Sequence, residues 1–143
     1  MNKWLLLIYK IPREPSAHRV GVWRKIKQLG AVLLHDAVWV LPANSRTQEQ
    51  FQWLAAEIID LGGEATLCVS QMASESQQQS LVRQFSAKAD EAYKDILGEL
   101  RRKGADLSAL GRRYQQILAQ DFFQSKLGDR VRSALLAKGD KQP

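Results

Sequence analysis

The first apolar stretch of the chain, residues 4–9, has apolar side chains at both odd and even positions. A strand at the surface of a sheet alternates apolar and polar side chains, because only one of its faces is buried. An unbroken apolar run therefore predicts a central strand with both faces covered. Pro12 ends the run, since proline has no N–H to donate to a neighbouring strand. We expect this strand to pair antiparallel with a second strand at residues 38–41.

The apolar positions that follow predict a helix, a pair of strands, a second helix and a fourth strand. Ser16 is placed to cap the first helix and Gly30 to end it. Residues 31–42 indicate two strands joined by a tight turn, or one hairpin with a local bulge. Ser45 with Gln48 is a capping-box pattern for the second helix. This βαββαβ order is that of a ferredoxin-like sandwich, an antiparallel sheet with two helices on one face.

From residue 75 onward the apolar positions have helical spacing only. A long helix that Gly104 breaks, followed by a helix that Asp106 caps, predicts a helical hairpin, with a short third helix near the C terminus. We therefore expect an α+β protein in two parts. A ferredoxin-like sandwich would cover residues 1–74, and a C-terminal helical extension packed on it would cover residues 75–143.

Basic residues gather directly after the first strand, in a chain whose net charge is +6. The candidate DNA-binding residues are Lys10, Arg13, Arg19, Arg24, Lys25 and Lys27. Such clusters bind backbone phosphates by releasing counterions, without reading bases. The alternative interpretation is that these residues form a solvated helix face with no ligand. It does not explain Arg19, because the helical angle of this residue places it near the apolar stripe. A second cluster, at residues 101–113, is explained first as a complement to a helix C terminus.

Other kinds of site are disfavoured by the residue types and their spacing. The carboxylates are scattered, whereas acid–base catalysis or metal binding needs them to converge. Cys68 is the single cysteine, and the two histidines have no helical spacing to each other, so no disulfide, metal or cofactor is expected. Cys68 and all four tryptophans fall in elements where core packing explains them, with base stacking as the lesser alternative for a tryptophan. The first apolar run is too short to span a bilayer, so we expect a cytoplasmic protein without a membrane partner.

Several motifs along the chain resemble a known family. They are Ile-Pro-Arg-Glu-Pro-Ser at 11–16, Val-Trp-Arg at 22–24, Leu-Gly-Ala-Val at 29–32, Val-Trp-Val-Leu-Pro at 38–42, Arg-Gln-Phe at 83–85, Asp-Glu at 90–91 with Tyr93, and Asp-Phe-Phe at 121–123. Together they resemble the N-terminal domain of ChrB proteins, regulators associated with bacterial chromate-resistance operons. The resemblance implies a transcriptional regulator that controls a chromate-efflux operon. With the basic cluster and the scattered carboxylates, we expect this regulator to be DNA-associated and non-catalytic. Because typical members carry a further domain thought to sense chromate, a separate chromate-sensing protein is an expected partner.

Two alternatives to a DNA-associated regulator stay open. The order of elements is more remotely similar to the small ferredoxin-like subunit of CRISPR adaptation and to a domain of phenylacetate-pathway repressors. The nuclease version of that subunit carries an acidic residue near the end of its first strand. Here the corresponding residues are Tyr9, Lys10 and Ile11, which disfavours a metal-dependent nuclease. The other alternative is an interaction module whose basic face meets an acidic protein. We also expect a homodimer, because the sheet face without helices needs a cover, from the C-terminal hairpin or a second subunit.

Overall fold

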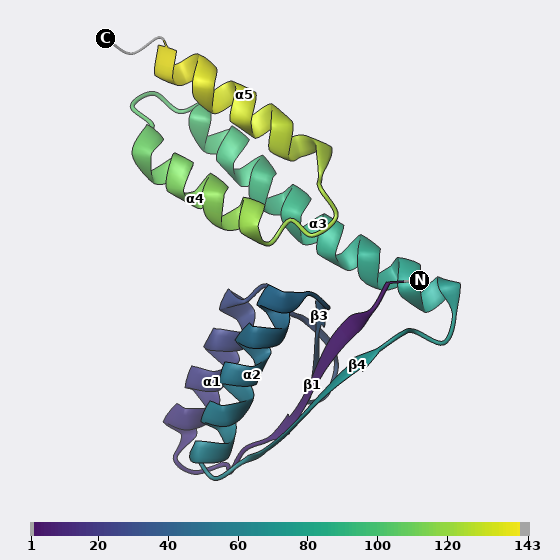
Figure 1. The fold of residues 1–143 in the computed structure, drawn as a ribbon. Coiled ribbons are helices and arrows are strands. Elements are labelled where there is room, and N and C mark those ends of the chain that lie inside the picture. The colour runs from purple at the N-terminus through teal and green to yellow at the C-terminus, as the bar shows by residue number, and fades with distance from the viewer. Residues whose placement is uncertain (1, 141–143) are drawn as a thin grey trace. The chain divides into compact units, whose positions relative to one another are not determined.

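The computed structural model describes residues 2–140. These residues form two compact units, which divide after Gln79. Figure 1 shows both units, and each is described here by itself. The expected division after residue 74, with the helical extension packed on the sandwich, stays a prediction.

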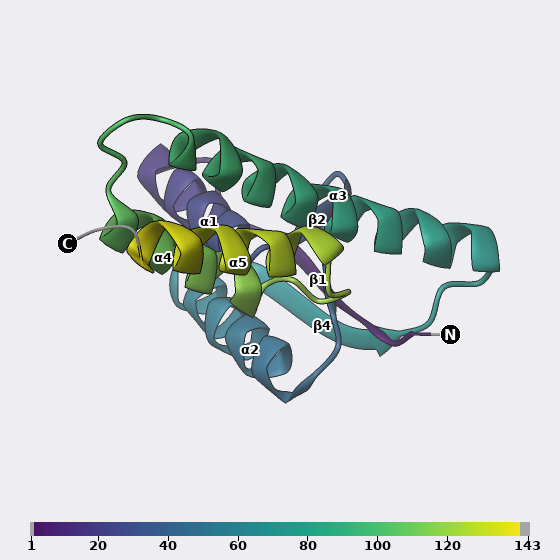
Figure 2. The same cartoon turned by 90° about the horizontal axis from the view of Figure 1, so that it is seen from above.

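The N-terminal unit is a four-stranded antiparallel sheet with two helices over residues 2–79. Its elements are β1 (Trp4–Lys10), α1 (Ser16–Gln28), β2 (Val32–His35), β3 (Val38–Pro42), α2 (Ser45–Asp60) and β4 (Glu64–Ser70). The strand order is β2-β3-β1-β4, so β1 is an interior strand, and it pairs antiparallel with β3 and β4. Both helices lie on one side of the sheet (Figures 1 and 2). The predicted ferredoxin-like sandwich, with β1 antiparallel to β3, is confirmed.

Local hydrogen bonds explain where α2 begins, and they correct the predicted capping box by one residue. The N-cap is Asn44, whose side chain accepts from the Thr47 backbone N–H at 2.8 Å. Thr47 Oγ1 in turn accepts from the Asn44 N–H at 3.0 Å and donates to the Pro42 carbonyl at 2.6 Å. Ser45 is therefore the first helical residue. The N-cap of α1 is likewise Pro15 rather than Ser16, and no side chain caps this helix.

The hairpin of β2 and β3 corresponds to the bulged alternative. The pairing of the two strands shifts between Leu33 and His35. Asp36 makes the turn with a φ of 47°, a left-handed conformation that short polar side chains tolerate. The chain reverses there and returns as β3 beside β1.

The two faces of β1 are buried to different extents. Leu5 and Leu7, on one face, are fully buried. On the other face Trp4 is also fully buried, and its indole N–H donates to Gln78 Oε1 at 2.7 Å. Ile8, further along that second face, is 41% exposed. The prediction of a strand covered on both faces is therefore correct only at its Trp4 end.

Over residues 80–140, the C-terminal unit contains three helices around a core of its own. The helices are α3 (Glu75–Leu100), whose first residues belong to the N-terminal unit, α4 (Leu107–Ala119) and α5 (Lys126–Asp140). The core residues are Ala89, Tyr93, Ile96, Leu100, Leu110, Tyr114 and Val131. Gly104 has a φ of 78°, and Asp106 caps α4 by accepting from the Ala109 N–H at 3.1 Å. The predicted break and cap are confirmed, but α5 is a full third helix rather than a short addition to a hairpin.

No helix within residues 2–140 combines the length and apolarity needed to cross a membrane.

The connection between α4 and α5 is fixed to α3 by a network of hydrogen bonds. The fully buried Tyr93 donates from its hydroxyl to Asp121 Oδ2 at 2.9 Å. Asp121 Oδ1 also accepts from the Ser125 backbone N–H at 3.0 Å. Ser125 Oγ donates to Asp90 of α3 and accepts from the Leu127 N–H at 3.1 Å, which starts α5. Burial raises the pKa of Tyr93 above its ordinary value, and the hydrogen bond to Asp121 adds to this shift.

An aromatic cluster lies in the same unit. The ring of Phe85 meets that of Phe122 edge-on, with centroids 5.7 Å apart, and that of Phe123 at 6.2 Å. Residues 83–85, 90–93 and 121–123, which carry part of the family resemblance, thus include the contacts between α3 and the α4–α5 connection. Packing of the C-terminal unit explains why Phe85, Tyr93 and Asp121–Phe123 occur there.

Candidate nucleic-acid interface on helix α1

Helix α1 has a basic outer face. Its sequence, Ser-Ala-His-Arg-Val-Gly-Val-Trp-Arg-Lys-Ile-Lys-Gln, contains no carboxylate. Val22 and Ile26 are its buried residues, and they fix which side faces the core. At 100° per residue, Val20, Arg24 and Lys27 lie on the opposite side, and all three are exposed. This stripe combines cations with apolar surface and has no acidic side chain.

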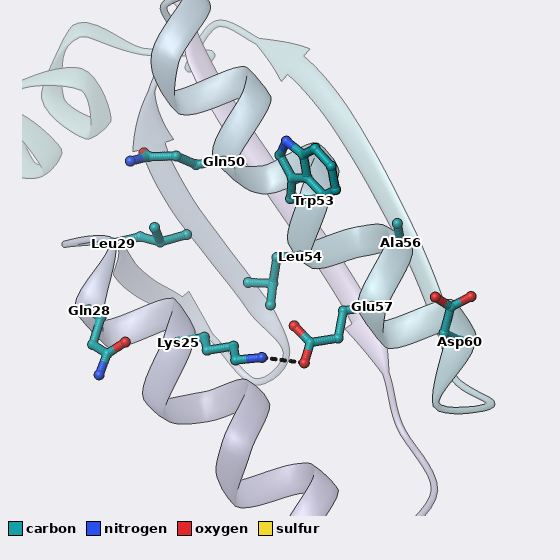
Figure 3. Close-up of a pocket in the computed structure, with 9 residues that line it drawn as sticks. All are labelled: Lys25, Gln28, Leu29, Gln50, Trp53, Leu54, Ala56, Glu57 and Asp60. Atoms are coloured by element: carbon teal, nitrogen blue, oxygen red, sulfur yellow. Dashed lines mark hydrogen bonds and ion pairs between the residues drawn. The ribbon is translucent and has the colours of Figure 1, made fainter.

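The six predicted DNA-binding residues do not share one environment. Lys10, Arg13, Arg19, Arg24 and Lys27 are exposed. Lys25 is exposed as well, but it reaches towards α2, where its Nζ forms an ion pair with Glu57 (Figure 3). Its charge is therefore partly neutralised within the unit. Of the six, only Lys25 takes part in an ion pair among the described residues. Arg24 and Lys27 share the exposed stripe of α1 opposite its buried side, which makes these two the best candidates for an external anion.

Arg19 lies where its unusual helical angle suggested, near the end of β1. Burial raises the pKa of Tyr9, while a hydrogen bond with Trp39 and the charge of Arg19 act to lower it. The guanidinium of Arg19 is thus close to the Tyr9 phenol and also exposed. A cation is tolerated beside the apolar stripe because its side chain is exposed to solvent.

The four tryptophans divide into two buried and two exposed side chains. Trp4 and Trp39 are core residues, as predicted. Trp23 is 47% exposed and Trp53 is 73% exposed, so the prediction that core packing explains all four is wrong for these two. Lys27 Nζ lies 4.6 Å from the centroid of the Trp23 ring, a cation–π contact across one helical turn. The i, i+4 spacing of an aromatic residue and a lysine was the signal in the sequence.

A groove of about 420 Å³ separates α1 from α2 and differs chemically from the outer face of α1. Figure 3 shows the Lys25–Glu57 ion pair spanning it, with Trp53 on the α2 side. Asp60 also lines this groove, so two carboxylates stand on the helix that carries Trp53. Their negative charge disfavours a phosphate there.

The remaining candidates offer less. Within residues 2–140, no three or more His, Cys, Asp or Glu side chains come together in a way that could hold a metal ion. Cys68 in β4 is half-buried rather than a core residue. In the second basic cluster, Arg113 forms an ion pair with Glu99 at 3.0 Å, while Arg102 and Lys103 are exposed.

Comparisons with known proteins agree with the motifs. The family model described as "Protein ChrB, N-terminal" matches residues 19–107, from within α1 to the first residue of α4. Protein ChrB of Cupriavidus metallidurans is 31% identical over 105 residues, which cover 73% of this chain and 32% of that protein. The matched part thus spans about a third of this curated relative. No solved structure matches the chain.

Proposed function

Since the chain belongs to the family of the ChrB N-terminal domain, we propose that it acts in chromate resistance as a DNA-associated transcriptional regulator. The observation that carries the DNA contact is the outer face of α1. Arg24 and Lys27 are exposed there on a helix without a carboxylate, while Lys25 is occupied by Glu57. Exposed cations of this kind bind phosphates in any duplex, so they supply affinity, and sequence preference must come from other contacts.

A salt titration of duplex binding tests this contact. We expect affinity to fall steeply with salt, with a log–log slope of about −0.9 for each phosphate neutralised. Arg24→Ala or Lys27→Ala should weaken binding to all duplexes similarly and make the slope shallower by about one. Both residues are exposed, so the free energy of unfolding should change by no more than about 0.5 kcal/mol.

Lys94→Ala is the matched control for this titration. Lys94 is an exposed lysine of α3, so its replacement removes the same charge from a different helix. We expect its slope to equal that of the wild type. If Arg24→Ala and Lys27→Ala also bind as the wild type does at every salt concentration, α1 does not contact DNA. Its basic face would then be a solvated surface or a contact for an acidic protein.

We also propose that the regulator is non-enzymatic, against the alternative of a metal-dependent nuclease. Lys10 occupies the end of β1, where a metal-binding carboxylate would be needed. The purified protein should therefore leave DNA and RNA intact in the presence of Mg²⁺ or Mn²⁺, as measured by gel electrophoresis. Cleavage that copurifies with the protein and disappears in Asp36→Ala would overturn the proposal.

The expected homodimer and the separate chromate-sensing partner stay predictions. Part of the second face of β1, represented by Ile8, is exposed and available to a second subunit. A dimer would present two copies of α1 to a duplex, which is how many regulators reach adequate affinity for an operator.

A further inference from the structure

We propose that Trp23 stacks on an unpaired base of the DNA that Arg24 and Lys27 hold, so that the protein prefers locally unpaired DNA to a perfect duplex. This inference rests on the proposed DNA contact and deepens it by naming the form of DNA. Aromatic side chains beside cations are the usual platform for unstacked bases, because every base has a π-face and every nucleotide a phosphate. In a paired duplex the faces of the bases are covered by their neighbours.

The surroundings of Trp23 provide both parts of such a platform. Its side chain is 47% exposed on a helix with no carboxylate. Lys27 Nζ lies over one face of the Trp23 ring, 4.6 Å from its centroid, so the base stacks on the opposite face and this cation stands at the ring to meet a phosphate of the same strand. Arg24 is the next residue in the chain and is exposed as well. Val20, one turn earlier, extends the apolar surface and is also exposed.

Trp53 shows why exposure alone does not make a tryptophan a base platform. It is more exposed than Trp23, but it lies on α2 in the groove that Glu57 and Asp60 also line. On its other side a second shallow pocket includes Glu49. A nucleotide on Trp53 would bring its phosphate towards these carboxylates, which is unfavourable. Trp53 is therefore an internal control, since it is the same aromatic side chain in negatively charged surroundings.

The experiment compares two DNA ligands by fluorescence anisotropy at one fixed salt concentration. One is a fully paired duplex, and the other is the same duplex with a central stretch of mismatched bases. We expect the wild type to bind the mismatched duplex about tenfold more tightly, as one base stacked on an aromatic ring allows. Trp23→Ala should abolish this preference and leave binding to the paired duplex within about twofold. Trp23→Phe should retain most of the preference, and Trp53→Ala all of it.

The outcomes separate this inference from the proposed function. If both DNAs bind equally well, or if Trp23→Ala keeps the preference, base stacking by Trp23 is wrong, while DNA binding that depends on Arg24 still stands. If Trp53→Ala loses the preference instead, the unpaired base contacts the groove between α1 and α2, and the inference is overturned. If neither DNA binds, the inference and the proposed function fail together, and an acidic protein becomes the expected partner of α1.

Discussion

Replacing Gly63 by alanine is expected to destabilise the N-terminal unit by about 3 kcal/mol. Gly63 lies between α2 and β4, and a Cβ atom there would overlap the carbonyl oxygen of Lys10 and lie 2.8 Å from Ile58 Cγ2. The Lys10 carbonyl cannot retreat easily, because Lys10 is paired with Glu64 where β1 meets β4. The Gly63 N–H also donates to the Ile58 carbonyl at 2.9 Å, so the glycine itself is held in place.

Urea denaturation followed by tryptophan fluorescence measures this effect specifically. All four tryptophans of the chain lie before residue 80, so their emission reports the N-terminal unit. Gly98→Ala is the matched control, because nothing lies within 4 Å of a Cβ at this helical position of α3. That change should stabilise α3 by about 1 kcal/mol and leave the fluorescence midpoint largely unchanged. A wild-type midpoint for Gly63→Ala would mean that the α2–β4 turn moves freely.

The fold could be predicted from the sequence because most of it is encoded locally. The apolar run of β1, the left-handed Gly30 after α1 and the cap at Asp106 each act within a few residues. Gly63 is different, because a side chain there is excluded by the carbonyl of Lys10 in β1, 53 positions earlier in the chain. No local sequence pattern predicts that this carbonyl lies against Gly63. The predicted third helix is shorter than α5 for a similar reason, since the start of this helix depends on Ser125, which is hydrogen-bonded to Asp90 of α3.

The basic face could be predicted as a group of charges but not as an arrangement. Nothing in the sequence distinguishes Lys25 from Lys27, yet Lys25 pairs with a carboxylate 32 residues away. Trp23 and Trp53 depart from the prediction because a tryptophan in an amphipathic helix usually belongs to the core, whereas both of these are exposed. For Trp23 the helical angle relative to Val22 and the cation at i+4 could have corrected the assignment. Trp53 is 73% exposed, but the sequence around it does not indicate this, because the next residue, Leu54, is buried.

Asp121→Ala is expected to destabilise the C-terminal unit by about 3 kcal/mol, because it removes the acceptor of two different groups. The Tyr93 hydroxyl, which is fully buried, would lose its partner, and so would the Ser125 N–H. A buried donor left unpaired costs about 1–3 kcal/mol. The Tyr93 ring cannot turn away, because Gly128 lies against it so closely that a Cβ there would be 3.1 Å from the hydroxyl oxygen. Tyr93→Phe removes the donor as well and should cost only about 1 kcal/mol.

Hydrogen–deuterium exchange measures where Asp121→Ala loses stability, and we expect the loss in the peptides of α4 and α5. Asp95→Ala is the control, because Asp95 is an exposed carboxylate of α3 and its replacement should change exchange little.

Stability at alkaline pH supplies a second measurement. Since the pKa of Tyr93 is raised in the folded unit, the native state holds this proton more tightly than the unfolded chain does. The resulting stability is complete below pH about 10 and is lost as the pH rises further, because the unfolded chain then releases the proton first. Tyr93→Phe should lack this alkaline loss. Equal exchange in Asp121→Ala and Asp95→Ala, together with an unchanged alkaline transition in Tyr93→Phe, would show that the network does not hold the α4–α5 connection in place.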